Sequence, residues 1–87
     1  MYKVVLTRKA QKAYQQADTS LVLKLNRCFE TISLNPYRHP NIKSLKGQLK
    51  GRWRYRVGSY RVVYRIDEVN KKVTVLLIAS RGEVYQQ

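Results

Sequence analysis

The most chemically suggestive feature of this 87-residue sequence is a run of arginines that alternate with mainly apolar residues. They are Arg52, Arg54, Arg56, Arg61 and Arg65. The segments 52–57 and 60–66 have the two-residue period of strands, and Gly58-Ser59 between them is a hairpin turn signal of the Gly-X type. Alternate side chains of a strand share a face, so the five arginines are predicted on one face of one hairpin.

Cross-strand pairing in this hairpin brings like charges together. Counting outward from the turn pairs Arg56 with Arg61, Arg54 with Val63, and Arg52 with Arg65. Directly opposed like charges destabilise a sheet by about 0.2–1 kcal/mol. An anion would offset this cost, and the planar arginine side chain binds phosphate through two parallel hydrogen bonds. The pattern therefore predicts an anion-binding face with phosphate as its natural ligand.

The overall charge also favours a polyanionic partner. Lys and Arg number 18 against 5 Asp and Glu, which gives a formal net charge of +13. No acidic residue occurs between Ile32 and Ile66, whereas four further cations do: Arg38, Lys43, Lys46 and Lys50. A charge run is usually only a solvated face. Here the one-sided alternation without a compensating acid favours polyanion binding.

Aromatic side chains fall on the opposite face of the hairpin by the same alternation. They are Trp53, Tyr55, Tyr60 and Tyr64. We interpret them as core residues packed against helices and not as platforms for base stacking. Cys28 lies on the apolar stripe of a predicted helix and is likewise expected in the core, since nothing near it in sequence would activate its thiol.

Length and composition restrict the function classes. We expect a single domain, 1–87, which argues against a multidomain enzyme and against a large enclosed cofactor pocket. With one Cys and one His, no disulfide and no zinc cluster are predicted, and neither a metal nor a cofactor is expected. The longest apolar run, 73–79, is far shorter than the roughly 20 residues of a membrane span. We expect a soluble, cytoplasmic protein.

Two helices are predicted before the hairpin. A β-rich segment, 2–6, leads to a helix over 8–17 with Thr7 as its N-cap. A second helix begins at one of the capping residues 18–20 and ends before Pro36. Its apolar stripe is Leu21, Leu25, Cys28, Phe29 and Ile32.

The remaining elements complete the expected fold. The segment 37–51 reads as a loop, and 72–79 reads as a third strand after the hairpin. The continuous apolar character of that strand favours a central position covered on both faces. The expected fold is α+β, of order β-α-α-β-β-β, with two N-terminal antiparallel helices packed on a small, mostly antiparallel twisted sheet.

Three stretches of the sequence resemble a known family: Leu45–Gly47, the hairpin Trp53–Tyr64 and the segment Ile78–Tyr85. The family is the RelE/ParE superfamily of bacterial type II toxins, and the branch is that of the RelE-like messenger-RNA interferases. The resemblance implies a metal-independent endoribonuclease that cleaves messenger RNA in the ribosomal A site through the RNA's own 2′-hydroxyl, and so inhibits translation. It also implies a cognate antitoxin as partner in a hetero-oligomer, with the ribosome and messenger RNA as further partners.

The resemblance assigns catalysis to Arg61, Arg81 and Tyr85. Arg61 would hold the scissile phosphate, and Arg81 would assist the departing 5′-oxygen. Tyr85 matches the C-terminal tyrosine of the family. Further contacts with RNA or with transition-state charge are expected from Arg52, Arg54, Arg56, Arg65, Lys46 and Lys50.

Two departures from the family leave the general base open. Arg54 and Arg56 stand where the best-described member carries lysines, and Ser80 stands where many relatives carry histidine. Attack by a 2′-hydroxyl needs a proton acceptor, and a guanidinium accepts protons poorly. The acceptor is either Tyr85, activated by the arginines around it, or a group supplied by the ribosome.

Two other functions stay open at this point. A toxin of the same fold could inhibit DNA gyrase without nuclease activity, in which case Arg81 and Tyr85 would be dispensable. A non-catalytic RNA- or ribosome-binding module would depend on charge alone, and each arginine would then contribute modestly and in a salt-dependent way.

Overall fold

The computed structural model describes residues 1–80 of the chain. In chain order the elements are β1 (Lys3–Leu6), α1 (Arg8–Gln16), α2 (Thr19–Leu34), β2 (Ile42–Ser44), the short 3-10 helix η1 (Gly47–Leu49), β3 (Trp53–Val57), β4 (Tyr60–Asp67) and β5 (Lys72–Ser80). The predicted order of elements is confirmed, with β2 and η1 added to it. The segment expected to be a loop contains β2, a three-residue strand at the edge of the sheet.

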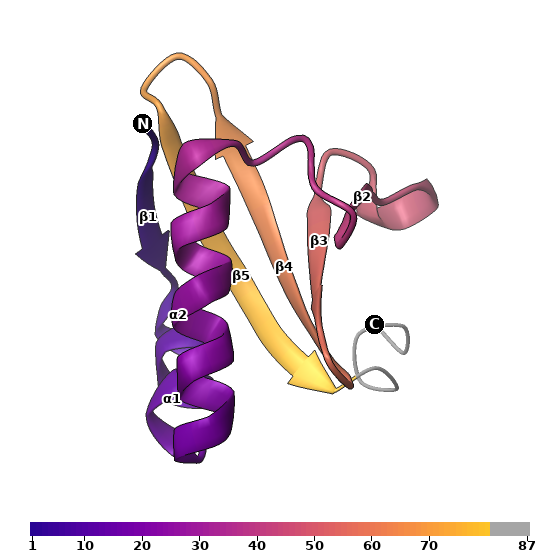
Figure 1. The fold of residues 1–87 in the computed structure, drawn as a ribbon. Helices are drawn as coiled ribbons and strands as arrows, with labels where there is room; N and C mark the ends of the chain where they lie inside the picture. The colour runs from indigo at the N-terminus through magenta and orange to yellow at the C-terminus, as the bar shows by residue number, and fades with distance from the viewer. Residues whose placement is uncertain (81–87) are drawn as a thin grey trace.

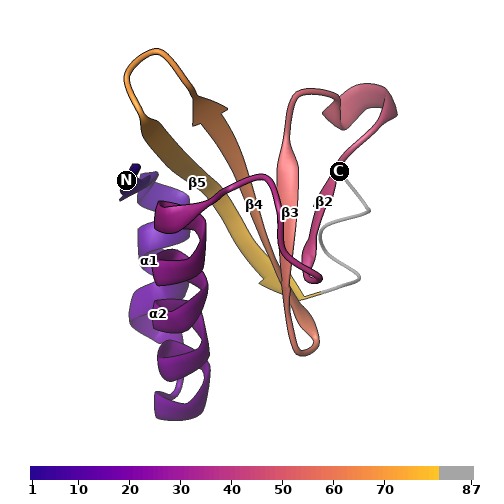
Figure 2. The ribbon, with the colours of Figure 1, turned by 45° about the horizontal axis from the view of Figure 1, so that its top comes forward.

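The strands form one mixed sheet in the order β1-β5-β4-β3-β2. β1 runs parallel to β5, and all other neighbouring strands are antiparallel. Both helices lie on the same side of this sheet (Figure 1, Figure 2). The predicted α+β class and helix pair are therefore confirmed, and β3 and β4 are left with one face that neither helix covers.

Each helix begins at a side-chain cap. The Thr7 hydroxyl accepts a hydrogen bond from the backbone N–H of Ala10 at 3.2 Å, and the Asp18 carboxylate accepts one from the N–H of Leu21 at 2.8 Å. Such caps satisfy N–H groups that have no partner within the helix. Of the three capping candidates before the second helix, Asp18 is the one used.

The core lies between the helices and the covered face of the sheet. Its fully buried side chains include Leu25, Cys28 and Ile32 from α2 and Val62, Tyr64, Val73 and Val75 from the sheet. The Tyr64 hydroxyl donates a hydrogen bond to the carbonyl oxygen of Pro36 at 2.7 Å, which fixes the chain leaving α2 over β4. The aromatic residues of the hairpin belong to this core or pack against it, as predicted.

A β-bulge divides the pairing of β4 with β5. Val63 pairs with Leu77 and Tyr64 pairs with Val75, so Leu76 has no opposite residue. The carbonyl oxygen of Leu76 accepts a hydrogen bond from the Thr7 hydroxyl at 3.2 Å. The bulge therefore puts both Val75 and Ile78 in the core, which strict alternation would not do.

The prediction of a central position for the last strand is confirmed, since β5 lies between β1 and β4, and within residues 1–80 helices cover only one of its faces. On the face away from the helices, Val63 and Ala79 form only a small second cluster with Leu45 and Leu77. The long apolar run of β5 is explained by the bulge and by this small cluster, not by a second layer of helices. Neither helix within residues 1–80 is long and apolar enough to cross a membrane.

Candidate functional site

The uncovered face of the hairpin carries three of the predicted arginines together. Arg56 lies directly opposite Arg61, and Arg54 lies opposite Val63 two pairs further along the ladder, as the turn predicted. Gly58 adopts a φ of 58°, the left-handed conformation that the first position of this tight turn requires. We call Arg54, Arg56 and Arg61 the arginine face.

Arg61 is the most deeply buried member of the arginine face. Its side chain is only 6% exposed, and it lies opposite the small Ala79 of β5. Nη1 donates to the carbonyl oxygen of Tyr60 at 3.2 Å, whereas the buried Nε has no hydrogen-bond partner among the described residues. A buried donor without a partner costs about 1–3 kcal/mol. Such a group is suited to donate to an anionic ligand.

Asn41 organises the other side of the arginine face. Its carbonyl oxygen accepts from the backbone N–H of Arg56 at 2.9 Å and from Nη1 of Arg54 at 2.8 Å. Its side-chain Nδ2 donates to the carbonyl oxygen of Arg56 at 2.9 Å. Sequence analysis missed Asn41, although an asparagine that follows a proline in a loop is a common source of hydrogen bonds to backbone groups.

The other predicted cations lie in two further places. Lys46, Lys50 and Arg52 line a hollow of about 350 Å³ in the loop before β3. The expected pairing of Arg52 with Arg65 is wrong, because the ladder between β3 and β4 ends at Trp53 and Tyr64. The N–H of Arg52 instead donates to the carbonyl oxygen of Leu49 at 3.1 Å, so Arg52 belongs to the loop.

Arg65 lies apart from the arginine face. It pairs with Thr74 of β5 and borders a separate hollow of about 450 Å³ whose other charged residues are Asp67, Glu68 and Lys72. Arg81 and Tyr85 lie outside the described residues. The described part of the predicted site is therefore Arg54, Arg56 and Arg61 on one surface, with a cationic loop beside them.

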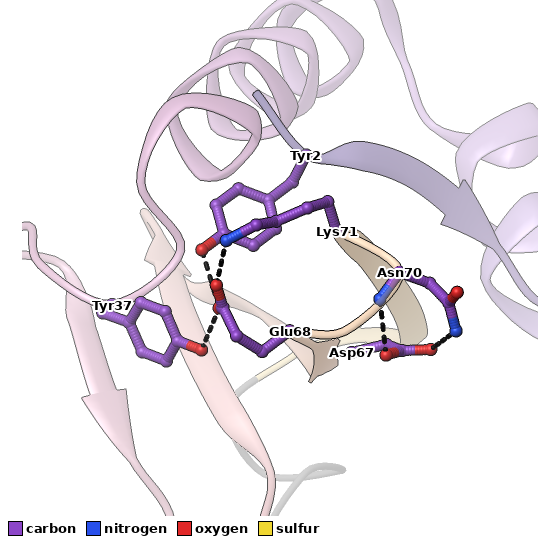
Figure 3. Close-up of polar contacts among 6 residues, drawn as sticks. All are labelled: Tyr2, Tyr37, Asp67, Glu68, Asn70 and Lys71. Atoms are coloured by element: carbon purple, nitrogen blue, oxygen red, sulfur yellow. Dashed lines mark hydrogen bonds and ion pairs between the residues drawn. The ribbon is translucent and has the colours of Figure 1, made fainter.

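Acidic side chains within residues 1–80 leave the arginine face unneutralised. The one ion pair in that range joins Glu68 to Lys71 in the turn between β4 and β5. Glu68 Oε1 also accepts hydrogen bonds from the hydroxyls of Tyr2 and Tyr37, both at 2.7 Å (Figure 3). This turn is at the opposite end of β4 from Arg61, roughly 20 Å away at strand spacing.

The partners of Glu68 hold it in the charged form. Hydrogen bonds from Lys71, Tyr37 and Tyr2 lower the pKa of Glu68 to about 2. The bond to Glu68 in turn raises the pKa of Tyr37 to about 12. Asp67 accepts from the backbone and side chain of Asn70, so both carboxylates serve the turn, as their adjacency in sequence predicted.

The chemistry available to the described residues is that of anion binding. Three guanidinium groups can hold a phosphate and stabilise charge that develops on it, and one of them, Arg61, has a buried Nε without a partner in residues 1–80. Tyr64 is no candidate for proton transfer there, since burial raises its pKa and its side chain lies on the covered face. His39 stacks on the core residue Tyr55 with ring centroids 5.1 Å apart.

Comparison with known proteins finds relatives whose descriptions agree with one another. A family model described as the ParE toxin of the type II toxin–antitoxin system matches residues 4–85. Toxin RelE of Mycobacterium tuberculosis is 31% identical over 86 residues, which is 98% of this chain and 87% of that protein. These matches extend over nearly the whole chain.

Solved structures give the same answer for the fold. A YoeB/ParE toxin from Agrobacterium tumefaciens is 25% identical with a TM-score of 0.81, covering 91% of this chain and 98% of that chain. A chain of a RelBE toxin–antitoxin complex from Mycobacterium tuberculosis is 28% identical with a TM-score of 0.81, covering 92% of this chain and 98% of that chain.

Proposed function

Because the chain belongs to the RelE/ParE family of toxins of type II toxin–antitoxin systems, we propose that it is a ribosome-dependent endoribonuclease that cleaves messenger RNA in the A site. The proposed reaction needs no metal. The 2′-hydroxyl of the RNA attacks the adjacent phosphorus in line with the departing 5′-oxygen, which leaves a 2′,3′-cyclic phosphate on one product and a 5′-hydroxyl on the other.

The observation that carries this proposal is the geometry of Arg61. A guanidinium that is 6% exposed, with an unpartnered buried Nε among the described residues, faces the like charge of Arg56 across the ladder. Such an arrangement does not stabilise the folded protein. An anionic phosphorane bound there would supply the missing acceptor and offset the repulsion.

The roles of the arginine face follow from position and charge. Arg61 would bind the scissile phosphate, and Arg54 and Arg56 would stabilise the charge that builds on its oxygens. We propose further that Arg81 assists the departing 5′-oxygen. The proton of the 2′-hydroxyl goes either to Tyr85 or to a ribosomal group.

We also propose a cognate antitoxin as partner. The chain from Mycobacterium tuberculosis that is 28% identical to this one was solved as part of a toxin–antitoxin complex. With a net charge of +13 and no acidic partner for the arginine face within residues 1–80, an acidic segment of an antitoxin would find complementary charge on this surface. Its binding there would block access of RNA to Arg61.

Primer extension on messenger RNA in a purified translation system tests the proposal. Wild-type protein should produce discrete cuts within A-site codons only when ribosomes are present. Arg61→Ala should slow single-turnover cleavage by about 10²–10³-fold, the usual effect of losing one donor to a transition-state oxyanion. Arg8→Ala, which removes an exposed arginine of α1, is the matched control and should cleave normally. Growth arrest on expression without any cuts would contradict the proposal.

Inhibition of DNA gyrase is the second candidate. It is favoured by the match of residues 4–85 to the ParE family model. A supercoiling assay separates the two candidates, because a gyrase inhibitor would act on purified gyrase and would keep its activity after Arg81→Ala or Tyr85→Phe.

A further inference from the structure

A second basic hollow lies beside the tip of the hairpin, next to the arginine face. It has a volume of about 200 Å³ and opens between α2 and the tip of the hairpin. Its charged lining is Lys24 and Arg27 from α2 and Arg56 from β3, and its remaining wall includes Asn41 and Gly58. We call this hollow the α2 notch.

Local structure explains why these side chains converge. Lys24 and Arg27 are three residues apart and so share one face of α2, beside the stripe that buries Leu25 and Cys28. Packing of that stripe against the sheet brings the cationic flank of α2 next to β3. On the opposite wall, the two hydrogen bonds between Asn41 and Arg56 hold the strand in place.

The charge of the α2 notch is uncompensated. Among residues 1–80, no carboxylate lines it and none of its three cations takes part in an ion pair. Its volume of about 200 Å³ leaves room for a phosphate group. Three cations around a hollow of this size favour an anion of that kind.

The α2 notch is continuous with the arginine face through one residue. Arg56 lines the notch and also lies directly opposite Arg61. A single strand of RNA with one phosphate at Arg61 can therefore follow the basic surface past the hairpin tip towards Lys24 and Arg27. Phosphate contacts of this kind fix position on the protein and carry no base specificity.

We propose that the α2 notch binds a backbone phosphate of the RNA strand next to the cleaved one, so that Lys24 and Arg27 set the path of the strand. This proposal rests on the proposed nuclease function for the identity of the strand. It assigns Lys24 and Arg27 to positioning and not to the chemical step.

Paired charge removals on the two helices test the proposal. The variant Lys24→Gln/Arg27→Gln is compared with Lys9→Gln/Lys12→Gln, an exposed pair at the same spacing on α1. This control pair lines a hollow of similar volume, about 210 Å³, that has only two cations and does not include Arg56. The probe is a fluorescein-labelled single-stranded 2′-O-methyl RNA 12-mer, which lacks the attacking hydroxyl. Its affinity is measured by anisotropy between 50 and 200 mM salt, and thermal melts establish that every variant is folded.

The α2 pair should weaken binding on the order of 5-fold at 150 mM salt and reduce the salt slope by about 0.7 for each phosphate that is no longer neutralised. The α1 pair should change affinity less than 2-fold. Equal losses of RNA affinity in both variants would overturn the proposal, because the effect would then follow from net charge alone. It would also fall if wild-type protein fails to bind the probe, or if the α2 pair binds RNA normally but loses an acidic antitoxin peptide.

A cleavage assay distinguishes this proposal from the proposed function. In the ribosome assay the α2 pair should raise the toxin concentration needed for half-maximal cleavage and keep the single-turnover rate at saturation, whereas Arg61→Ala should lose that rate. Selective loss of RNA binding in the α2 pair, together with no cleavage by wild-type protein, would leave the α2 notch standing and refute the nuclease.

Discussion

Asn41 is joined to Arg56 at both backbone groups of that residue: the Asn41 carbonyl oxygen accepts from its N–H and the Asn41 side chain donates to its carbonyl oxygen, each at 2.9 Å. The Asn41 carbonyl oxygen also accepts a hydrogen bond from the Arg54 guanidinium. A loop residue without charge thereby fixes the strand that carries two arginines of the candidate site.

Asn41→Ala should therefore affect both stability and RNA binding. The substitution removes the hydrogen bond from Nδ2 and keeps the backbone contacts, so we expect a loss of about 0.5–1.5 kcal/mol in the free energy of unfolding. RNA affinity should fall because β3 is held less firmly. Urea unfolding and anisotropy measure the two effects, with the exposed Gln11→Ala as control; an Asn41→Ala protein that matches this control in both would contradict the assigned role.

Arg61→Met should separate stability from function. Methionine fills a similar volume and removes a buried charge whose Nε has no partner within residues 1–80. We expect the free energy of unfolding to rise by about 1 kcal/mol while cleavage is lost, as is common where a binding site stores strain. Thermal melts and primer extension check this, and a marked fall in melting temperature would show that Arg61 serves the fold.

Stability should depend on Glu68 at acid pH. Its hydrogen bonds lower the pKa to about 2, below the value of an unfolded glutamate near 4.3, so its contribution is complete above that unfolded value and is lost as pH falls towards 2. Urea unfolding of wild type and Glu68→Gln at pH 2 to 6 should show curves that converge as the pH falls. Parallel curves over this range would contradict the role of Glu68.

The thiol of Cys28 should be unreactive in the folded protein. Burial raises its pKa to about 12, so almost no thiolate exists near neutral pH, and the side chain is fully buried in the core. Ellman's reagent at pH 8 should label it only at the rate of unfolding and label it at once in urea. Rapid labelling without denaturant would argue against the packing of α2.

Sequence alone predicts those features that depend on local period and turn chemistry. The alternation from Trp53 to Ile66 and the Gly58-Ser59 signal give the hairpin register and the shared face of Arg54, Arg56 and Arg61, because side chains of a strand alternate strictly. The two helices follow in the same way from their N-cap residues and from the apolar stripe of the second helix. These features need no knowledge of distant contacts.

The remaining features depend on tertiary contacts that leave little local signal. β2 is three residues long, and its pairing depends on β3. The bulge at Leu76 depends on Thr7, a residue 69 positions away. Arg52 and Arg65 do not pair because the ladder between β3 and β4 ends one pair before them. The α2 notch forms only once α2 packs on the sheet.

The parallel pairing of β1 with β5 also bears on the order in which the sheet can form during synthesis of the chain. The β1 residues Lys3 to Leu6 are made long before their hydrogen-bonding partners, Lys72 to Val75, which come late among the described residues. Such a distant closure cannot form on a nascent chain until those partners emerge, and it slows folding once they do. The edge of the sheet at β1 can therefore form only after the hairpin and β5 have been synthesised.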